Sequence, residues 1–231
     1  MLAQLSTVIE PRRPSMDSGG CRVCGRSCGP AIGPEREGWR LPVCFCCRTL
    51  AGQLHLPLVP LVALTEYRVG DATHKRLRAY KDAPVAEARE RCRVELVAEL
   101  ARRCDDASTI LGGWTVVTTV PSSTRPGGSP AERLVDGVPQ MAQRHLRLLV
   151  RGRGSGGHLR AGRDVFAPDV GVDRAGLASL SVLVFDDTTT TGAAAQSAAA
   201  ALRLAGARVV GALVMGRALA PEAGIPAPVG R

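Results

Sequence analysis

Aromatic side chains are scarce in this chain of 231 residues, in which Phe, Trp and Tyr together make up 3%. Proteins that bind single strands by stacking bases need such rings, so this scarcity argues against a stacking platform. No apolar run is long enough to span a membrane, and we expect no membrane partner. The first twenty residues have no sustained apolar stretch and contain Pro11 and Pro14, so we expect no secretory signal and a cytoplasmic protein.

Acidic residues are outnumbered, with 21 Asp and Glu against 30 Lys and Arg, which gives a net charge of +9. They are absent from residues 137–163, which contain six arginines. This charge suits polyanionic partners, either phosphorylated small molecules or nucleic acid, although it equally suits the solubility of a basic protein. The length allows one good core and a small additional module.

Cysteine is well represented, and four of the eight cysteines form two close pairs. Cys21-x-x-Cys24 and Cys44-x-x-Cys47 are separated by nineteen residues that are rich in Gly and Pro. Cysteines of a cytoplasmic protein are more often metal ligands or free thiols than disulfides. Two such pairs can hold one tetrahedral zinc, which would supply the folding energy of this segment. Four thiolate ligands leave no open coordination position for water or substrate, so we expect a structural zinc and not a catalytic one.

Two further thiols, Cys28 and Cys46, leave alternatives open. Cys46 can compete with Cys44 or Cys47 as a ligand. A redox pair and a decayed metal site are the other interpretations of the same pattern.

The most informative stretch lies near the C-terminus. Val182–Phe185 is a continuous apolar run, typical of a strand that is buried on both faces of a parallel sheet. Asp186 and Asp187 follow, then Thr188–Gly192. The alanine-rich segment Ala193–Ala205 has high helix propensity, and the next residue is a glycine, which is suited to a helix C-terminus. The order predicted is strand, polar loop and helix N-terminus.

This order has a chemical use. A helix N-terminus binds phosphate through unpaired N–H groups and the positive end of its dipole. Thr190 and Thr191 add hydroxyl donors, and Gly192 allows close approach of the backbone. The two carboxylates before them suit sugar hydroxyls, so the site fits a sugar phosphate. The alternative is an Asp-rich turn in which the threonines only cap the helix.

Residues 182–193 resemble the motif with which type I phosphoribosyltransferases bind 5-phosphoribosyl 1-pyrophosphate (PRPP). The resemblance implies that Asp186 and Asp187 hold the ribose hydroxyls and act as the catalytic acid pair. It also implies a cradle for the 5-phosphate. The residues of that cradle are Thr188, Thr189, Thr190, Thr191, Gly192 and Ala193.

A second loop of the site is expected after the β-rich run Trp114–Val120. In these transferases the corresponding loop holds the pyrophosphate, and here Ser122, Ser123, Thr124 and Arg125 are the candidates; a plain surface loop is the alternative. Ser129 to Glu132 form a capping box that predicts the start of a helix.

The rest of the chain is assigned more coarsely. Residues 55–64 are expected to be an apolar connector, and the basic run 75–81 is either a solvated face or a phosphate-facing surface. Leu146–Val150 and Val209–Met215 are predicted strands. The Gly-rich, basic segment 151–163 corresponds in position to the hood that closes over PRPP in this fold; a disordered linker is the alternative.

The paired cysteines, the Tyr80-Lys81 dipeptide and the PRPP-type motif together resemble the ComF family, the competence-protein-like phosphoribosyltransferases of bacteria. The resemblance covers residues 21–216 and implies an α/β fold, namely a type I phosphoribosyltransferase core (51–216) with a zinc module (21–50) and flexible tails (1–20 and 217–231). It implies PRPP with Mg²⁺ as ligand and release of pyrophosphate. The alternative is a non-catalytic accessory of DNA uptake, with single-stranded DNA or a competence helicase as partner.

Overall fold

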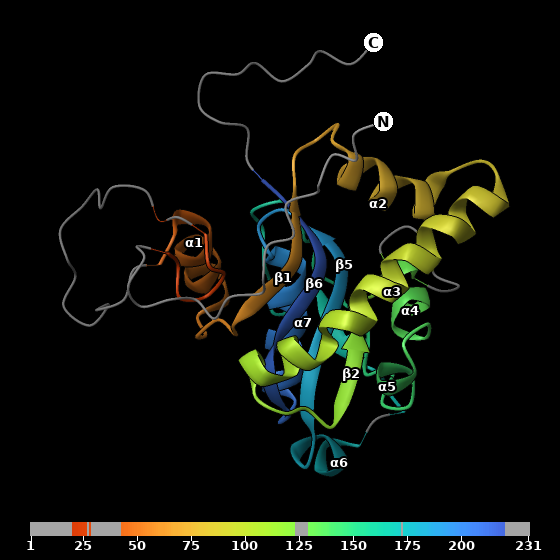
Figure 1. Cartoon of the computed structure of the whole chain (residues 1–231). Helices are drawn as coiled ribbons and strands as arrows, with labels where there is room; N and C mark the ends of the chain where they lie inside the picture. The colour runs from red at the N-terminus through yellow and green to blue at the C-terminus, as the bar shows by residue number, and fades with distance from the viewer. Residues whose placement is uncertain (1–19, 27, 29–42, 123–128, 172, 220–231) are drawn as a thin grey trace.

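The chain folds around a parallel β-sheet (Figure 1). The structure is a computed structural model that describes residues 20–26, 28, 43–122, 129–171 and 173–219. Its sheet has four strands in the order β1-β6-β5-β2, and every neighbouring pair is parallel. The strands are β1 (Leu61–Tyr67), β2 (Val116–Thr119), β5 (Ser181–Thr189) and β6 (Arg208–Ala218). The expected α/β architecture, a parallel sheet flanked by helices, is therefore confirmed.

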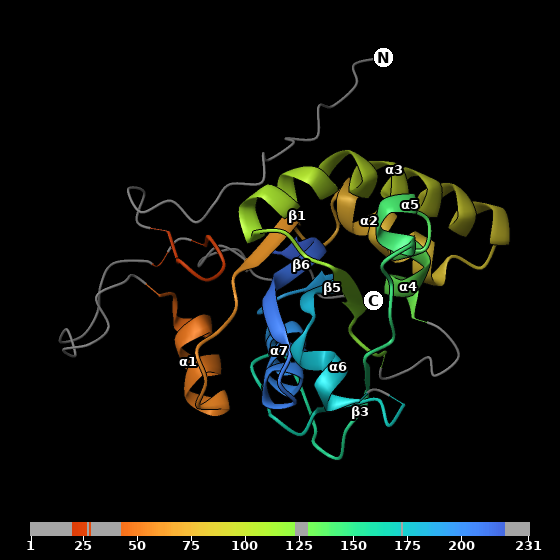
Figure 2. The ribbon, with the colours of Figure 1, turned by 90° about the horizontal axis from the view of Figure 1, so that it is seen from below.

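Helices cover both faces of the sheet (Figure 2). One face carries α2 (Ala72–Asp82), α3 (Ala86–Leu111), α4 (Pro130–Val135) and α5 (Pro139–Ala142). The other carries α7 (Ala193–Leu204), α6 (Arg174–Ala178) and an arm made of β3 (Leu149–Arg151) and β4 (Phe166–Pro168). Helix α1 (Phe45–Leu54) lies beyond the β1 edge. Within the described ranges, no helix has the length and apolar character needed to cross a bilayer.

Strand β5 shows why the apolar run gave a reliable prediction. Val182 and Val184 point into the cluster beneath α7, whereas Leu183 and Phe185 point into the cluster beneath α3, and all four are fully buried. A strand that is covered on both faces has no polar side to alternate with.

The connector expected at residues 55–64 is only half right, because Leu61 begins β1. This strand pairs in parallel with β6, for example Leu61 with Ala212. Pro60 lies just before the strand, a position that requires no N–H donor in the ladder, so its presence does not break the sheet. Strand β6 likewise continues to Ala218, past the expected end of the domain at residue 216.

The local signals for helix ends are confirmed. The hydroxyl of Ser129 accepts the N–H of Glu132, whose carboxylate accepts the N–H of Ser129 in return, and α4 starts there. Gly206 follows α7 with φ of 106°, a conformation that favours glycine. The strand expected at residues 146–150 is found as β3, which pairs antiparallel with β4 outside the main sheet. The expected tails lie, apart from residue 20 and residues 217–219, outside the described residues.

Candidate functional site

A polar pocket lies where β5 ends and α7 begins. Its volume is about 190 Å³. It is lined by Tyr67 of β1, two residues of the segment between β3 and β4, the carboxyl group of Asp186, and the first turn of α7. Residues 188–191, which we call the threonine loop, complete the lining. The lining residues are Tyr67, Gly157, His158, Asp186, Thr188, Thr189, Thr190, Thr191, Ala193 and Ala194. The structure thus brings most of the expected phosphate-cradle residues to one cavity wall.

The turn that enters α7 requires a glycine. Gly192 has φ of 86°, and a Cβ atom there would lie 2.7 Å from Cδ1 of Leu61. The neighbouring hydroxyls hold the turn, because Thr189 accepts the N–H of Gly192 at 2.8 Å and Thr191 accepts that of Ala193 at 3.4 Å. Both threonines therefore fix the backbone of the turn that leads into α7, and the loop is pre-formed around the cavity.

The two carboxylates of the acid pair have different surroundings. Asp186 lines the pocket. Asp187 is 7% exposed and is held by three donors: the hydroxyl of Tyr80 at 2.5 Å, Nζ of Lys81 at 2.9 Å and the hydroxyl of Thr188 at 3.1 Å. Of the two carboxylates, Asp186 alone is among the residues that line the pocket, and the role of both toward a ligand stays a prediction.

Burial, and then the neighbouring charge of Asp187, raise the pKa of Asp186 to about 8. Lys81 and the N–H of Asp187, which lies 2.9 Å from Oδ1 of Asp186, act in the opposite direction. Asp186 is consequently mostly protonated at neutral pH while Asp187 is paired with Lys81. The ion pair of Asp187 with Lys81 and the raised pKa of Asp186 both reduce the negative charge beside the helix N-terminus.

Helix α2 supplies the partners of the acid pair. The basic run 75–81 lies on this helix, where Arg76 pairs with Glu99 and Arg78 with Asp82. Lys81 reaches Asp187 and the hydroxyl of Thr188. The run is thus mainly a paired, solvent-facing surface with one lysine at the site. The sequence did not predict the contact of Lys81 with β5, because this contact joins positions 107 residues apart and leaves no local signal.

The four paired cysteines form a second candidate site. Cys21, Cys24, Cys44 and Cys47 are all buried, and their sulfur atoms lie within 4.8 Å of one another. The Sγ atoms of Cys24 and Cys44 are 3.7 Å apart. A tetrahedral zinc with Zn–S bonds of about 2.3 Å separates its sulfurs by about 3.8 Å, so the donor set fits that ion.

The spare thiols do not belong to this cluster. Cys28 and Cys46 are both partly exposed, and burial raises the pKa of each, which disfavours the thiolate form. The alternative in which Cys46 replaces a ligand therefore receives no support from the geometry.

The cysteine-containing module is joined to the edge of the sheet. The N–H of Leu61 donates to the carbonyl of Val23 at 2.7 Å. Arg217, buried at the end of β6, donates to the carbonyl of Cys24 and pairs with Glu66 of β1. We therefore expect the fold of the module and the ends of β1 and β6 to depend on each other.

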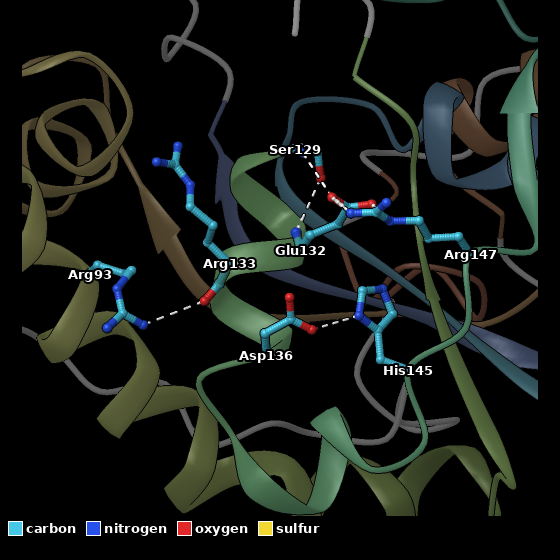
Figure 3. A network of polar contacts seen from close by, with 7 residues as sticks. All are labelled: Arg93, Ser129, Glu132, Arg133, Asp136, His145 and Arg147. Carbon is cyan, nitrogen blue, oxygen red and sulfur yellow. Dashed lines mark hydrogen bonds and ion pairs between the residues drawn. The ribbon is translucent and has the colours of Figure 1, made fainter. Parts of the chain in front are cut away.

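The loop expected to hold pyrophosphate can be placed only in part. Ser122 is described, whereas Ser123, Thr124 and Arg125 lie outside the described residues. The polar network in Figure 3 fixes the helix that follows the loop. It consists of the Ser129–Glu132 capping box, Arg147 on Glu132, His145 on Asp136, and Arg93 on the carbonyl of Arg133.

The basic segment 151–163 connects β3 to β4 and belongs to the same arm, so the alternative of a disordered linker is not supported. The N–H of Gly152 donates to Val165 and that of Gly154 to Asp164, which continues the β3–β4 pairing. The arm then turns back at residues 157–160 beside the pocket. Gly157 and His158 of this segment line the pocket, and its role as a hood stays a prediction.

No protein-family model matches the chain, and no curated protein matches its sequence. The pocket and the four-cysteine cluster are therefore the features from which its function can be inferred.

Proposed function

We propose that this chain is a PRPP-binding protein with a phosphoribosyltransferase-like core of the ComF type. The observation that carries the proposal is the composition of one pocket wall. Asp186, the threonine loop and the first turn of α7 line the same cavity, so acceptors for sugar hydroxyls adjoin donors for a phosphate. Few classes of small molecule other than sugar phosphates require both.

The electrostatics of the acid pair support this ligand. A carboxylate beside a phosphate site would normally repel the phosphate. Here Lys81 neutralises Asp187, and the raised pKa of Asp186 keeps that group mostly uncharged until a ligand arrives. A ribose hydroxyl that donates to Asp186 would stabilise its charged form and lower its pKa. Ligand binding would thus release a proton at neutral pH.

The proposed reaction is transfer of the phosphoribosyl group. An acceptor nucleophile forms a bond to the anomeric carbon, and the bond to pyrophosphate breaks with its electron pair on the departing oxygen. Magnesium would accompany PRPP and neutralise the leaving group. The chain's own contribution would be positioning by Asp186 and the threonine loop, and exclusion of water by Gly157 and His158, which also line the pocket.

Calorimetric titration of PRPP with Mg²⁺ into the zinc-loaded protein tests the proposal. We expect Asp186→Asn to weaken binding by about tenfold or more, since a hydrogen bond to a charged group is lost. Asp173→Asn, a change at an exposed carboxylate beside α6, is the matched control and should bind as the wild type does. Absence of binding by the folded wild type would contradict the proposal.

The second candidate is a non-catalytic DNA-uptake accessory, and one observation favours it. Arg153 and Arg160 on the arm are exposed and form no ion pair with another described residue, and Arg151 is exposed over the ring of Phe166. A triple charge reversal of these arginines should abolish salt-dependent binding of single-stranded DNA. Arg102→Glu, at an exposed position of α3, is the control. Unchanged affinity in the triple variant would rule this candidate out.

A further inference from the structure

Helix α1 connects the four-cysteine cluster to the pocket. Cys44 is the N-cap residue of this helix and Cys47 lies in its first turn, so two of the four candidate ligands fix its N-terminal end. The opposite end contacts residues 157–163, which we call the flap. Gly157 and His158 of the flap line the pocket.

Gln53, in the last turn of α1, binds the flap backbone in both directions. Its Nε2 donates to the carbonyl of Leu159 at 3.0 Å, and its Oε1 accepts the N–H of Ala161 at 2.8 Å. Arg163 at the end of the flap donates in return to the carbonyls of Leu54 and His55, at 2.5 and 3.0 Å, and so caps the C-terminal end of α1.

Apolar contacts complete the same joint. A separate buried cluster links α1, the flap and α7, and it consists of Leu50, Leu54, Ala161, Ala193 and Ala200. The flap is also held to α7, because Ser197 accepts the N–H of Gly162 at 3.1 Å and Thr191 donates to the carbonyl of His158. Ala193 and Thr191 are themselves pocket residues. One wall of the pocket is therefore assembled on the C-terminal end of α1.

A helix of this length cannot maintain itself. Helix α1 has ten residues, and isolated helices shorter than about 12–15 residues are marginal in water. Its N-terminal end lacks a side-chain cap. Metal coordination through Cys44 and Cys47 would supply the missing constraint.

We propose that the four-cysteine module is a positioning element of the pocket and that Gln53 is the residue that transmits its state to the flap. Metal binding at the cysteines then stabilises the flap in the position that closes the pocket wall. Because coupling between two sites is reciprocal, ligand binding in the pocket tightens metal binding by the same factor. The ligand side of this statement rests on the proposed function, whereas the flap side does not.

Hydrogen–deuterium exchange of the full-length protein tests the flap side. In Gln53→Ala with zinc retained, we expect exchange of the 157–163 peptide to rise about tenfold, the size of one or two lost net hydrogen bonds. Peptides from α3 should not change. Arg48→Ala, an exposed change on the same helix, is the control. Chelation of the metal from the wild type should give an equal or larger increase in the flap. A flap that exchanges like the wild type in both experiments would overturn the proposal.

Calorimetry with PRPP and Mg²⁺ tests the ligand side in the same variants. We expect affinity to fall about tenfold in Gln53→Ala and to be unchanged in Arg48→Ala, with metal content equal in both. Equal affinity in Gln53→Ala would overturn the coupling to the ligand. If the wild type binds no PRPP, the proposed function fails, and the exchange result still decides whether the module positions the flap.

Discussion

Tyr80 of α2 donates its hydroxyl hydrogen to Oδ2 of Asp187 at the end of β5, with 2.5 Å between the two oxygens. Burial, followed by the charge of Asp187, raises the pKa of Tyr80, so the hydroxyl remains a donor throughout the physiological range. A helix on one face of the sheet thereby fixes the strand end from which the pocket is built.

Tyr80→Phe should therefore destabilise the protein. Asp187 keeps Lys81 and Thr188 but loses one charge-assisted hydrogen bond in a buried position, and we expect a loss of about 1–3 kcal/mol in the free energy of unfolding. Urea denaturation measures this loss. Tyr67→Phe is the comparison, since the Tyr67 hydroxyl has no hydrogen-bond partner among the described residues, and it should cost about 0.5 kcal/mol or less. Equal losses in the two variants would contradict the role of this contact.

Stability should depend on pH through Asp186. Its pKa is raised from 3.8 to about 8, so the folded protein keeps a proton that the unfolded chain releases. The stabilising contribution is complete below the unfolded pKa and is lost as pH rises toward 8. Asp186→Asn removes this loss and should be more stable than the wild type at pH near 8, with little difference near pH 4. Unfolding curves across this range measure the difference, and Asp173→Asn should follow the wild type.

Gly192→Ala should damage the loop before α7. Alanine at φ of 86° is strained, and its Cβ would collide with the side chain of Leu61. We expect a loss of about 1–2 kcal/mol in stability together with weaker PRPP binding. Thermal melting of the variants measures the loss in stability. Gly52→Ala in α1, where a Cβ meets no atom within 4 Å, is the control and should be neutral or slightly stabilising. A Gly192 variant that melts like the wild type would contradict this interpretation of the turn.

Metal content should follow the four clustered cysteines. We expect one zinc per chain by elemental analysis, and its loss together with the fold of α1 in Cys21→Ser, because three thiolates leave the tetrahedron incomplete. Cys28→Ser and Cys46→Ser should retain the metal, since neither belongs to the cluster. Full metal content in Cys21→Ser, or its loss in Cys46→Ser, would show that the ligand set is different.

Features with a local cause were the predictable ones. The apolar run of β5, the glycine at the α7 turn, the Ser129 capping box and the cysteine pairs each depend on residues that are close in sequence. The contacts of Tyr80 and Lys81 with Asp187, and those of Gln53 with the flap, join positions that are more than a hundred residues apart, and only the folded chain brings them together. Strand β1 was missed for another reason: Pro60 suggested a connector, although it stands just outside the strand.

Strand β1 forms one border of the sheet, and its outward N–H at Leu61 is satisfied by Val23 of the cysteine module. An uncovered strand border is a template for pairing with another chain. The module therefore occupies a backbone group of β1 that could otherwise pair with another chain. If a metal holds the module in place, its removal should expose this strand border, and turbidity that grows with protein concentration should appear under conditions in which the rest of the core is still folded.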